Sequence, residues 1–228
     1  KILIKQKKTN LYLSCNLGLR TNPLFLDIKT KINKKNFFGK IFHIEGDYLW
    51  GRVNKFYGWR SKLKYYSKIY GSAVHIIDLI TWLIGDYPKF VFAEGNKIGT
   101  RNKMKFNSFV IINLIFKKNL IVKITGNGPC VHPHFHGLRI FGTNKTFTHD
   151  YNLTRFYSHK KINSLNLSKS LYPAKENRKQ VLDSFIKGVI NKRSKFFLVD
   201  TKSIYNVMNI CFAAEESMLT KKRIRIKY

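Results

Sequence analysis

The chain has 228 residues, 44% of them hydrophobic, which is enough for one large domain with a true core. Its formal net charge of +31 would suit a nucleic acid or an anionic membrane. Of the 43 basic residues, however, only 10 are Arg, which leaves 33 Lys spread over every segment. Arg is the better phosphate ligand, so this composition indicates a general bias toward Lys, Asn and Ile. This composition therefore disfavours a nucleic-acid partner.

The cysteines and the absence of long apolar runs limit the cellular context. Cys15, Cys130 and Cys211 are far apart and form no Cys-x-x-Cys motif, so neither a disulfide framework nor a zinc ribbon is predicted. No apolar run reaches the length of a membrane-spanning helix, and no signal peptide is recognisable. These features predict a cytoplasmic protein. The chain begins with Lys1, which suggests that its natural start lies upstream.

The first segment has the order strand, polar loop, helix. Residues 11–15 are a short apolar run typical of a buried strand, and Gly18 and Pro23 mark the loop that follows. Apolar residues then recur at helical spacing over 24–32. This order is how an α/β sheet presents functional groups at the carboxyl end of a strand.

From residue 40 onward the pattern changes to that of a sheet. Residues 40–50 alternate with a period of two, which predicts an antiparallel strand with one apolar face. Further predicted strands cover residues 90–98, 106–116, 120–125, 138–147 and 223–228. A tight turn is expected at 117–119 and a long surface loop over the polar residues 150–177. Two helices are predicted around 181–189 and 204–212.

Together these elements predict an α+β fold. Its main part is a large, open, mainly antiparallel sheet with helices on one face. The last strand and helix of an α/β unit of the Rossmann type precede this sheet. Asp200 or Thr201 is expected to cap the last helix.

The stretch from Tyr70 to Gly85 is the best candidate for a functional element. It is predicted to be a helix entered through a Gly-Ser turn and ended by Gly85, with His75, Asp78 and Trp82 on one face. Burial and nearby charges can tune such an imidazole to exchange protons near neutral pH. From these residues alone, a core histidine bonded to a backbone carbonyl is the alternative.

Two other clusters are candidates for chemistry. His132, His134 and His136 would share one face of an extended strand and could there hold zinc or copper. No carboxylate is patterned beside them, which favours a polar contact on the sheet or at a subunit interface. Glu45 and Asp47 could form the carboxylate pair of a glycoside hydrolase, but a solvated or ion-paired sheet face explains them more simply.

Several short motifs occur in an order that is specific as a set. They are Ser14-Cys-Asn16 with Arg20 and Pro23, Gly39-Lys-Ile, Gly58-Trp-Arg60, the stretch Gly71 to Gly85, Phe141-Gly-Thr143 and Ala213-Ala-Glu-Glu-Ser217. Together they span residues 11–228. In order and spacing they resemble the C-terminal two-thirds of the glucose–fructose oxidoreductase, inositol dehydrogenase and MocA-like family of NAD(P)-dependent sugar oxidoreductases.

This resemblance implies a function and a domain organisation. It implies NAD or NADP on an N-terminal Rossmann domain, and a sugar, cyclitol or related polyol between that domain and the open sheet. His75 falls on the family's base, which takes the proton of the substrate hydroxyl while hydride goes to the nicotinamide. Residues 1–23 would be a remnant of the dinucleotide-binding domain. Residues 24–228 would bind substrate and form a homo-oligomer through the open sheet.

The resemblance also implies further site residues. Asn16, Trp59 and Arg60 correspond to positions along the cofactor. The implied substrate-binding residues are Arg20, Ser67, Ser72 and Asp78. The family usually has an Asp one helical turn before the histidine, where this chain has Gly71. Either another group, such as Ser67, Lys68 or Ser72, replaces that carboxylate, or the site is altered.

The family's Gly-x-Gly-x-x-Gly loop and its Glu-Lys-Pro motif are absent from the sequence. We therefore expect the 228-residue chain to be inactive when isolated, even if the whole gene product is an oxidoreductase. Two alternatives remain: a non-enzymatic relative that acts as a binding or scaffold protein, and a basic nucleic-acid-binding protein.

Overall fold

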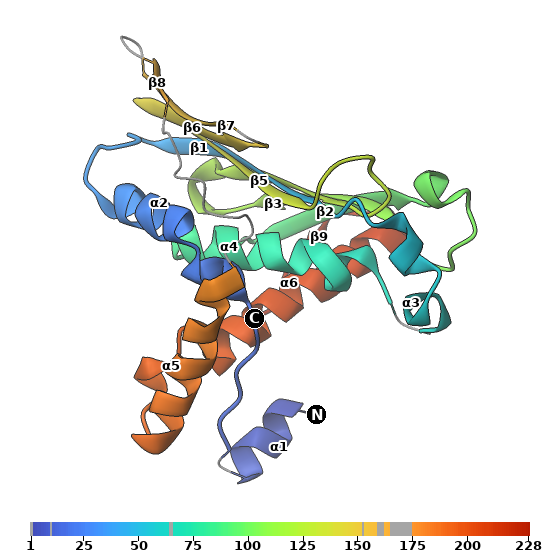
Figure 1. Cartoon of the computed structure of the whole chain (residues 1–228), viewed down its shortest axis with the longest axis horizontal. Helices are drawn as coiled ribbons and strands as arrows, with labels where there is room; N and C mark the ends of the chain where they lie inside the picture. The colour runs from blue at the N-terminus through green and yellow to red at the C-terminus, as the bar shows by residue number, and fades with distance from the viewer. Residues whose placement is uncertain (1, 10, 64–65, 152, 159–161, 165–174) are drawn as a thin grey trace.

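The computed structural model describes the chain except residues 1, 10, 64–65, 152, 159–161 and 165–174. Its strands form one sheet in the order β8-β7-β6-β5-β1-β4-β3-β2-β9. Helices α2, α4 and α6 lie on the same side of this sheet, and the described residues place no helix on the other side (Figure 1). The predicted α+β fold, with helices on one face of an open sheet, is confirmed.

The element bounds are as follows. The strands are β1 (Ile41–Leu49), β2 (Phe90–Asn96), β3 (Phe109–Ile115), β4 (Ile121–Asn127), β5 (Phe135–Gly142), β6 (Lys145–Asp150), β7 (Leu153–Ser158), β8 (Ile162–Ser164) and β9 (Ile224–Arg225). The helices are α1 (Ile2–Thr9), α2 (Pro23–Asn33), α3 (Trp59–Lys62), α4 (Val74–Ile84), α5 (Lys179–Ile190) and α6 (Thr201–Thr220). Short helical turns that matter for the site are η1 (Gly18–Thr21), η2 (Val53–Phe56), the π-helical turn η3 (Ile69–Ala73) and η6 (Lys175–Arg178).

The sheet is antiparallel except at its centre. Strand β1 pairs antiparallel with β5 but parallel with β4. The antiparallel strand predicted over residues 40–50 is therefore confirmed for the pair with β5, whereas the pair with β4 is parallel. The chain leaves β1, passes through α4 and returns by the β2–β3–β4 meander, and such a crossover is what allows a parallel pair.

Helix α4 packs against the centre of the sheet. Seven of its 11 residues are buried and the other four partly buried, because β1 lies on one side of it and α2 and α6 on the others. Gly46 of β1 makes this close approach possible: a Cβ there would lie 2.4 Å from Cγ2 of Ile76. The contact brings the start of α4 against the end of β1.

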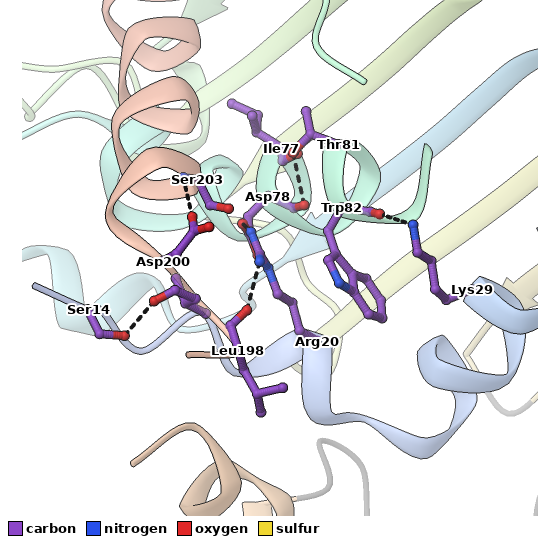
Figure 2. Close-up of polar contacts among 11 residues, drawn as sticks. Ser14, Arg20, Lys29, Ile77, Asp78, Thr81, Trp82, Leu198, Asp200 and Ser203 are labelled. Atoms are coloured by element: carbon purple, nitrogen blue, oxygen red, sulfur yellow. Dashed lines mark hydrogen bonds and ion pairs between the residues drawn. The ribbon is translucent and has the colours of Figure 1, made fainter. Parts of the chain in front are cut away.

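A buried ion pair fixes α4 to the N-terminal segment (Figure 2). Arg20 Nε and Nη2 donate to the two carboxylate oxygens of Asp78 at 3.0 and 2.5 Å, and Nη1 donates to the carbonyl of Leu198 at 2.9 Å. At the other end of α4, Lys29 Nζ donates to the carbonyl of Trp82 at 2.6 Å, and Gly85 ends the helix at φ +73°. The middle and the C-terminal end of α4 are thus both anchored.

The last helix begins as the sequence predicts. The carboxylate of Asp200 accepts a hydrogen bond from the backbone N–H of Ser203 at 2.7 Å (Figure 2). This is the N-cap geometry, which satisfies one of the free N–H groups at the start of α6.

The strand predicted over residues 11–15 was wrong. Residues 11–15 form no strand; Ser14 Oγ donates instead to the carbonyl of Val199, and Thr201 Oγ1 to that of Leu13. A strand needs a neighbouring ladder, and this segment lies beside the loop before α6.

The segment predicted as a surface loop, residues 150–177, contains the strands β7 and β8. Its composition is polar, but Thr154 and Phe156 both lie on the buried face of β7. The parts of that prediction at 159–161 and 165–174 fall outside the described residues.

The helix expected over 70–85 starts at Ile69, through a π turn rather than a Gly-Ser turn. The edge strand predicted over 223–228 is reduced to the two residues of β9. None of the helices in the described ranges has the length and apolar character needed to cross a membrane.

Removing one partner of the buried ion pair should be costly. Arg20→Ala leaves an uncompensated carboxylate at Asp78, so we expect the free energy of unfolding to fall by about 3–5 kcal/mol. Urea denaturation followed by circular dichroism measures this loss. Lys31→Ala, which breaks a surface ion pair with Asp27, is the matched control and should cost less than about 1 kcal/mol.

The double change Arg20→Met with Asp78→Leu leaves no buried charge. It should recover most of the stability lost in Arg20→Ala. A double variant as unstable as the single one would show that the hydrogen bond to Leu198, and not the charge pair, carries the effect.

Candidate active-site cleft

A cleft of about 240 Å³ lies where the first residues of α4, the end of β1, the start of β5 and the N-terminal loop meet. It is lined by Asn16, Gly18, Leu19, Asn22, Tyr48, Arg52, His75, His134, His136 and Arg178. Two of the residues predicted for the site, Asn16 and His75, are among them. Segments far apart in the sequence therefore share one cavity.

His75 enters the cleft from the second residue of α4. The π turn Ile69–Ala73 directly precedes the helix, and π turns of this kind often occur at functional sites. The imidazole is partly buried and stacks on the ring of Tyr48, with ring centroids 5.8 Å apart and planes inclined by 23°. The fixed helix and this stacking hold the ring at the cleft.

Tyr48 is the centre of a histidine cluster. It faces His136 directly across the β1–β5 ladder, with ring centroids 4.6 Å apart. The ring of His134 lies 5.3 Å from that of Tyr48 and 4.9 Å from that of His136. Both ring nitrogens of His134 are buried, and no described residue bonds to them. The wall of the cleft thus contains an imidazole whose nitrogens have no hydrogen-bond partner among the described residues.

The charges at the cleft are positive. Arg52 and Arg178 line it, neither forms an ion pair with a described residue, and no lining residue is an Asp or Glu. Burial, together with Arg178 and Lys68, lowers the pKa of His75 to about 4. Burial and Arg52 lower the pKa of His134 to about 4 as well. Both rings are therefore neutral at pH 7, and each keeps a nitrogen lone pair.

Behind Tyr48 lies a buried lysine. Lys68 is 1% exposed, and its ammonium nitrogen is 4.0 Å from the ring centroid of Trp50 and 5.1 Å from that of Phe56. No described residue accepts a hydrogen bond from it. Burial, with Arg60 as a second cause, lowers its pKa to about 7. Lys68 does not line the cleft, but its charge contributes to the lowered pKa of His75.

Four predicted substrate-binding residues lie outside the cleft lining. Arg20 and Asp78 are bonded to one another. Ser67 Oγ accepts a hydrogen bond from the N–H of Ile69 at 2.9 Å, and Ser72 Oγ donates to the carbonyl of Lys68 at 2.7 Å. These two serines are buried and bonded within the turn that precedes α4.

The predicted cofactor residues of α3 also lie apart from the cleft lining. Trp59 is 59% exposed. The guanidinium of Arg60 lies 4.2 Å from the ring centroid of Trp59 and 5.3 Å from that of Trp50. An exposed indole with a stacked guanidinium is a surface that a planar ligand can contact.

The histidine tract, His132, His134 and His136, lies only partly in the cleft. His134 and His136 enter the cleft, while the ring of His132 contacts Phe135 and Tyr151. Within the described ranges, no three His, Cys, Asp or Glu side chains come together in a way that could hold a metal ion. The sequence pattern singled out this tract, but its proximity to His75 depends on the pairing of β1 with β5.

Glu45 and Asp47 lie on the open face of the sheet, away from the helices. Lys123 and Arg139 contact Glu45 at 2.5 and 3.1 Å, and Arg139 also contacts Asp47 at 3.4 Å. Burial alone would raise the pKa of Glu45, but its bonds to Lys123 and Arg139 lower it to about 2. A glycosidase acid requires a raised pKa, so this pair is an ion-paired sheet surface, the simpler of the two predicted readings.

Gly71 is explained by its neighbour Tyr66. A Cβ at position 71 would lie 2.1 Å from the Tyr66 hydroxyl and 2.6 Å from the ring carbon that bears it. The phenol therefore fills the space that a side chain one turn before His75 would need. Any larger residue here, a carboxylate included, requires Tyr66 to move.

Comparison with known proteins identifies the family. Residues 26–148, more than half of the chain, match the sequence model of the GFO/IDH/MocA C-terminal domain. The chain belongs to the Gfo/Idh/MocA family of oxidoreductases. No curated protein sequence matches the chain significantly.

Solved structures agree in fold. The myo-inositol 2-dehydrogenase of Lactobacillus plantarum has a TM-score of 0.76 at 16% identity and matches over 92% of this chain. The scyllo-inositol dehydrogenase of Lactobacillus casei, solved with NAD(H) and scyllo-inositol, has a TM-score of 0.75 at 13% identity over 96% of this chain. An Agrobacterium radiobacter oxidoreductase in complex with NAD+, L-tartaric acid and magnesium has a TM-score of 0.78 at 12% identity over 96%. The chain spans only 64%, 66% and 66% of these structures.

A side chain at position 71 should destabilise the protein. We expect Gly71→Ala to lower the free energy of unfolding by about 1–3 kcal/mol, because the new methyl group collides with Tyr66. In a Tyr66→Ala background the same change should cost almost nothing. Gly137→Ala, whose Cβ would meet its nearest atom at 3.4 Å, serves as the control. Equal penalties with and without Tyr66 would contradict this explanation.

Proposed function

We propose that this chain is the substrate-binding domain of an NAD(P)-dependent dehydrogenase that oxidises a hydroxyl group of a sugar, cyclitol or related polyol. The observation that carries this proposal is His75, held at the start of α4 in a cleft that is lined mostly by polar side chains. Family membership and the inositol dehydrogenases of the same fold support it. The alternative is a relative that binds such a ligand without turnover.

In this proposal His75 takes the proton of the reacting hydroxyl. A neutral imidazole within hydrogen-bond reach of an alcohol can act as its base. Burial keeps His75 neutral at pH 7, and Tyr48 limits the tilt of its ring. Arg20 and Asp78 act as positioning residues, since their ion pair sets the position of α4 and hence of His75. Ser67 and Ser72 support the π turn from which the helix starts.

NAD or NADP, when bound, would accept the hydride. The residues of this chain suit only part of such a cofactor: Asn16 lies in the cleft, and Trp59 with Arg60 offers a stacking and cationic surface nearby. The sequence contains no Gly-x-Gly-x-x-Gly motif to bind the pyrophosphate. We therefore assign Asn16, Trp59 and Arg60 to the nicotinamide side and expect the isolated chain to show no turnover.

Replacement of His75 tests the catalytic assignment. In the protein expressed from the entire gene, His75→Ala should lower kcat by about 100-fold or more, with a smaller effect on KM, because a general base contributes that much. The assay follows NAD(P)H absorbance with a panel of sugars, inositols and sugar acids. His132→Ala is the control, since this histidine does not line the cleft.

Undiminished kcat in His75→Ala would remove the assignment. A whole protein that binds a polyol but never reduces NAD(P)+ would support the non-enzymatic alternative. Robust reduction by the 228-residue chain alone would place the cofactor site within it.

We further propose that a second copy of the chain covers the open sheet face. Phe92, Phe109 and Ile111 lie on it, and Ile121 there is 50% exposed. An apolar surface of this kind is unusual on a monomer. Sedimentation velocity should show an oligomer that Ile111→Lys dissociates and Ile98→Lys, at an exposed site outside the sheet, does not. A monomeric wild-type protein would contradict the proposal.

A further inference from the structure

Two arginines at the cleft have no partner of opposite charge among the side chains that the structure describes. Arg52 follows β1 and Arg178 ends η6, so segments far apart in the sequence each bring a guanidinium to the same cavity. Neither pairs with a described Asp or Glu. Arg178 packs against the N-terminal loop, since a Cβ at Gly18 would lie 3.2 Å from its Cγ. A pair of guanidiniums without carboxylates is suited to bind an oxyanion.

The same cavity contains a second sign of a ligand. Both nitrogens of His134 are shielded from solvent and lack a hydrogen-bond partner in the part of the chain that the structure describes. Buried polar atoms of folded proteins are almost always hydrogen-bonded. His134 lines the cleft, so a rotation of its ring toward the cavity would let a ligand there supply the missing partner. A neutral imidazole offers one donor and one acceptor, which suits a hydroxyl group.

We infer that the substrate of this cleft is an anionic polyol, whose carboxylate or phosphate is bound by Arg52 and Arg178 and whose hydroxyl groups are bound by His134. The inference rests on the proposed function of the cleft as a substrate site, and it narrows the substrate class. Neutral sugars and cyclitols would leave the two guanidiniums unpaired. They should therefore bind more weakly.

The charges around His75 are consistent with an anionic ligand. The groups that face it are Tyr48 from β1, His134 and His136 beside it, Lys68 from the turn before α4, and Arg178 from η6. The charged ones among them are cations that disfavour the protonated imidazole. A bound anion would offset their field and favour proton uptake by His75. This would compensate for the absence of a carboxylate at position 71.

Binding to the 228-residue chain tests the inference without the cofactor. Isothermal titration calorimetry at an ionic strength of about 0.15 M limits attraction to the overall charge of +31. The ligands are glucuronate, a phosphorylated glucose, neutral glucose and myo-inositol. We expect at least one anionic sugar to bind about tenfold or more tightly than glucose. Comparing glucuronate with the phosphorylated sugar decides between a carboxylate and a phosphate.

Variants locate the binding site. Arg52→Gln and Arg178→Gln should each weaken binding of the anionic sugar by about tenfold or more, and leave the weak binding of glucose unchanged. Arg101→Gln removes the same charge from an exposed site next to η4 (Ile98–Thr100) and should change neither. Because Arg52 and Arg178 are both exposed, circular dichroism should show that the variants fold normally. As a second readout, the NMR titration of the His75 ring should move to higher pH when the anionic sugar is bound.

Equal affinity for charged and neutral sugars would overturn the inference. So would equal weakening by Arg101→Gln, which would indicate attraction to the whole surface. These outcomes are separate from failure of the proposed function. His75-dependent oxidation of a neutral polyol alone would preserve the function and refute the anionic substrate. Arginine-dependent binding of glucuronate by a whole protein that never oxidises it would support the anionic ligand and refute the proposed function.

Discussion

The ion pair between Arg20 and Asp78 is the interaction on which the geometry of the cleft depends. It joins the turn before α2 to the middle of α4, and the third bond of Arg20 ties both to the loop before α6. Taking two charges out of water is costly, and the bidentate geometry of the guanidinium offsets that cost. His75 lies one turn earlier on the same helix. Its place is therefore set by the anchoring of α4.

Around this anchored helix, burial and positive charge act in the same direction. Each lowers the pKa of the cleft histidines, and no carboxylate among the lining residues opposes them. A charged side chain one turn before His75 would change this balance, but Tyr66 occupies its space at Gly71. The site is thus a cluster of neutral imidazoles lined by the positively charged side chains of Arg52 and Arg178. The anionic ligand that we propose would balance this positive charge.

The two faces of the sheet have separate roles. The helix face supplies the hydrophobic core and, at one end, the pair Tyr48 and His136 for the cleft. The open face combines apolar side chains with the ion-paired cluster of Glu45, Asp47 and Arg139. Since successive residues of a strand point to opposite faces, β1 contributes to both surfaces at once. A change in its register would disturb the cleft and the open face together.

The sequence by itself determined the α+β class, the helix that carries His75 and a cap at Asp200 or Thr201, because periodicity and capping are local properties. The order of short motifs also pointed to the correct family. The sequence could not show that residues 11–15 lack a strand partner, that Thr154 and Phe156 belong to a strand, or that Arg20 and Asp78 bond to each other. Only the tertiary structure brought His134, Arg52 and Arg178 to His75. Such contacts arise from strand pairing and from packing between distant segments, and no local pattern encodes them.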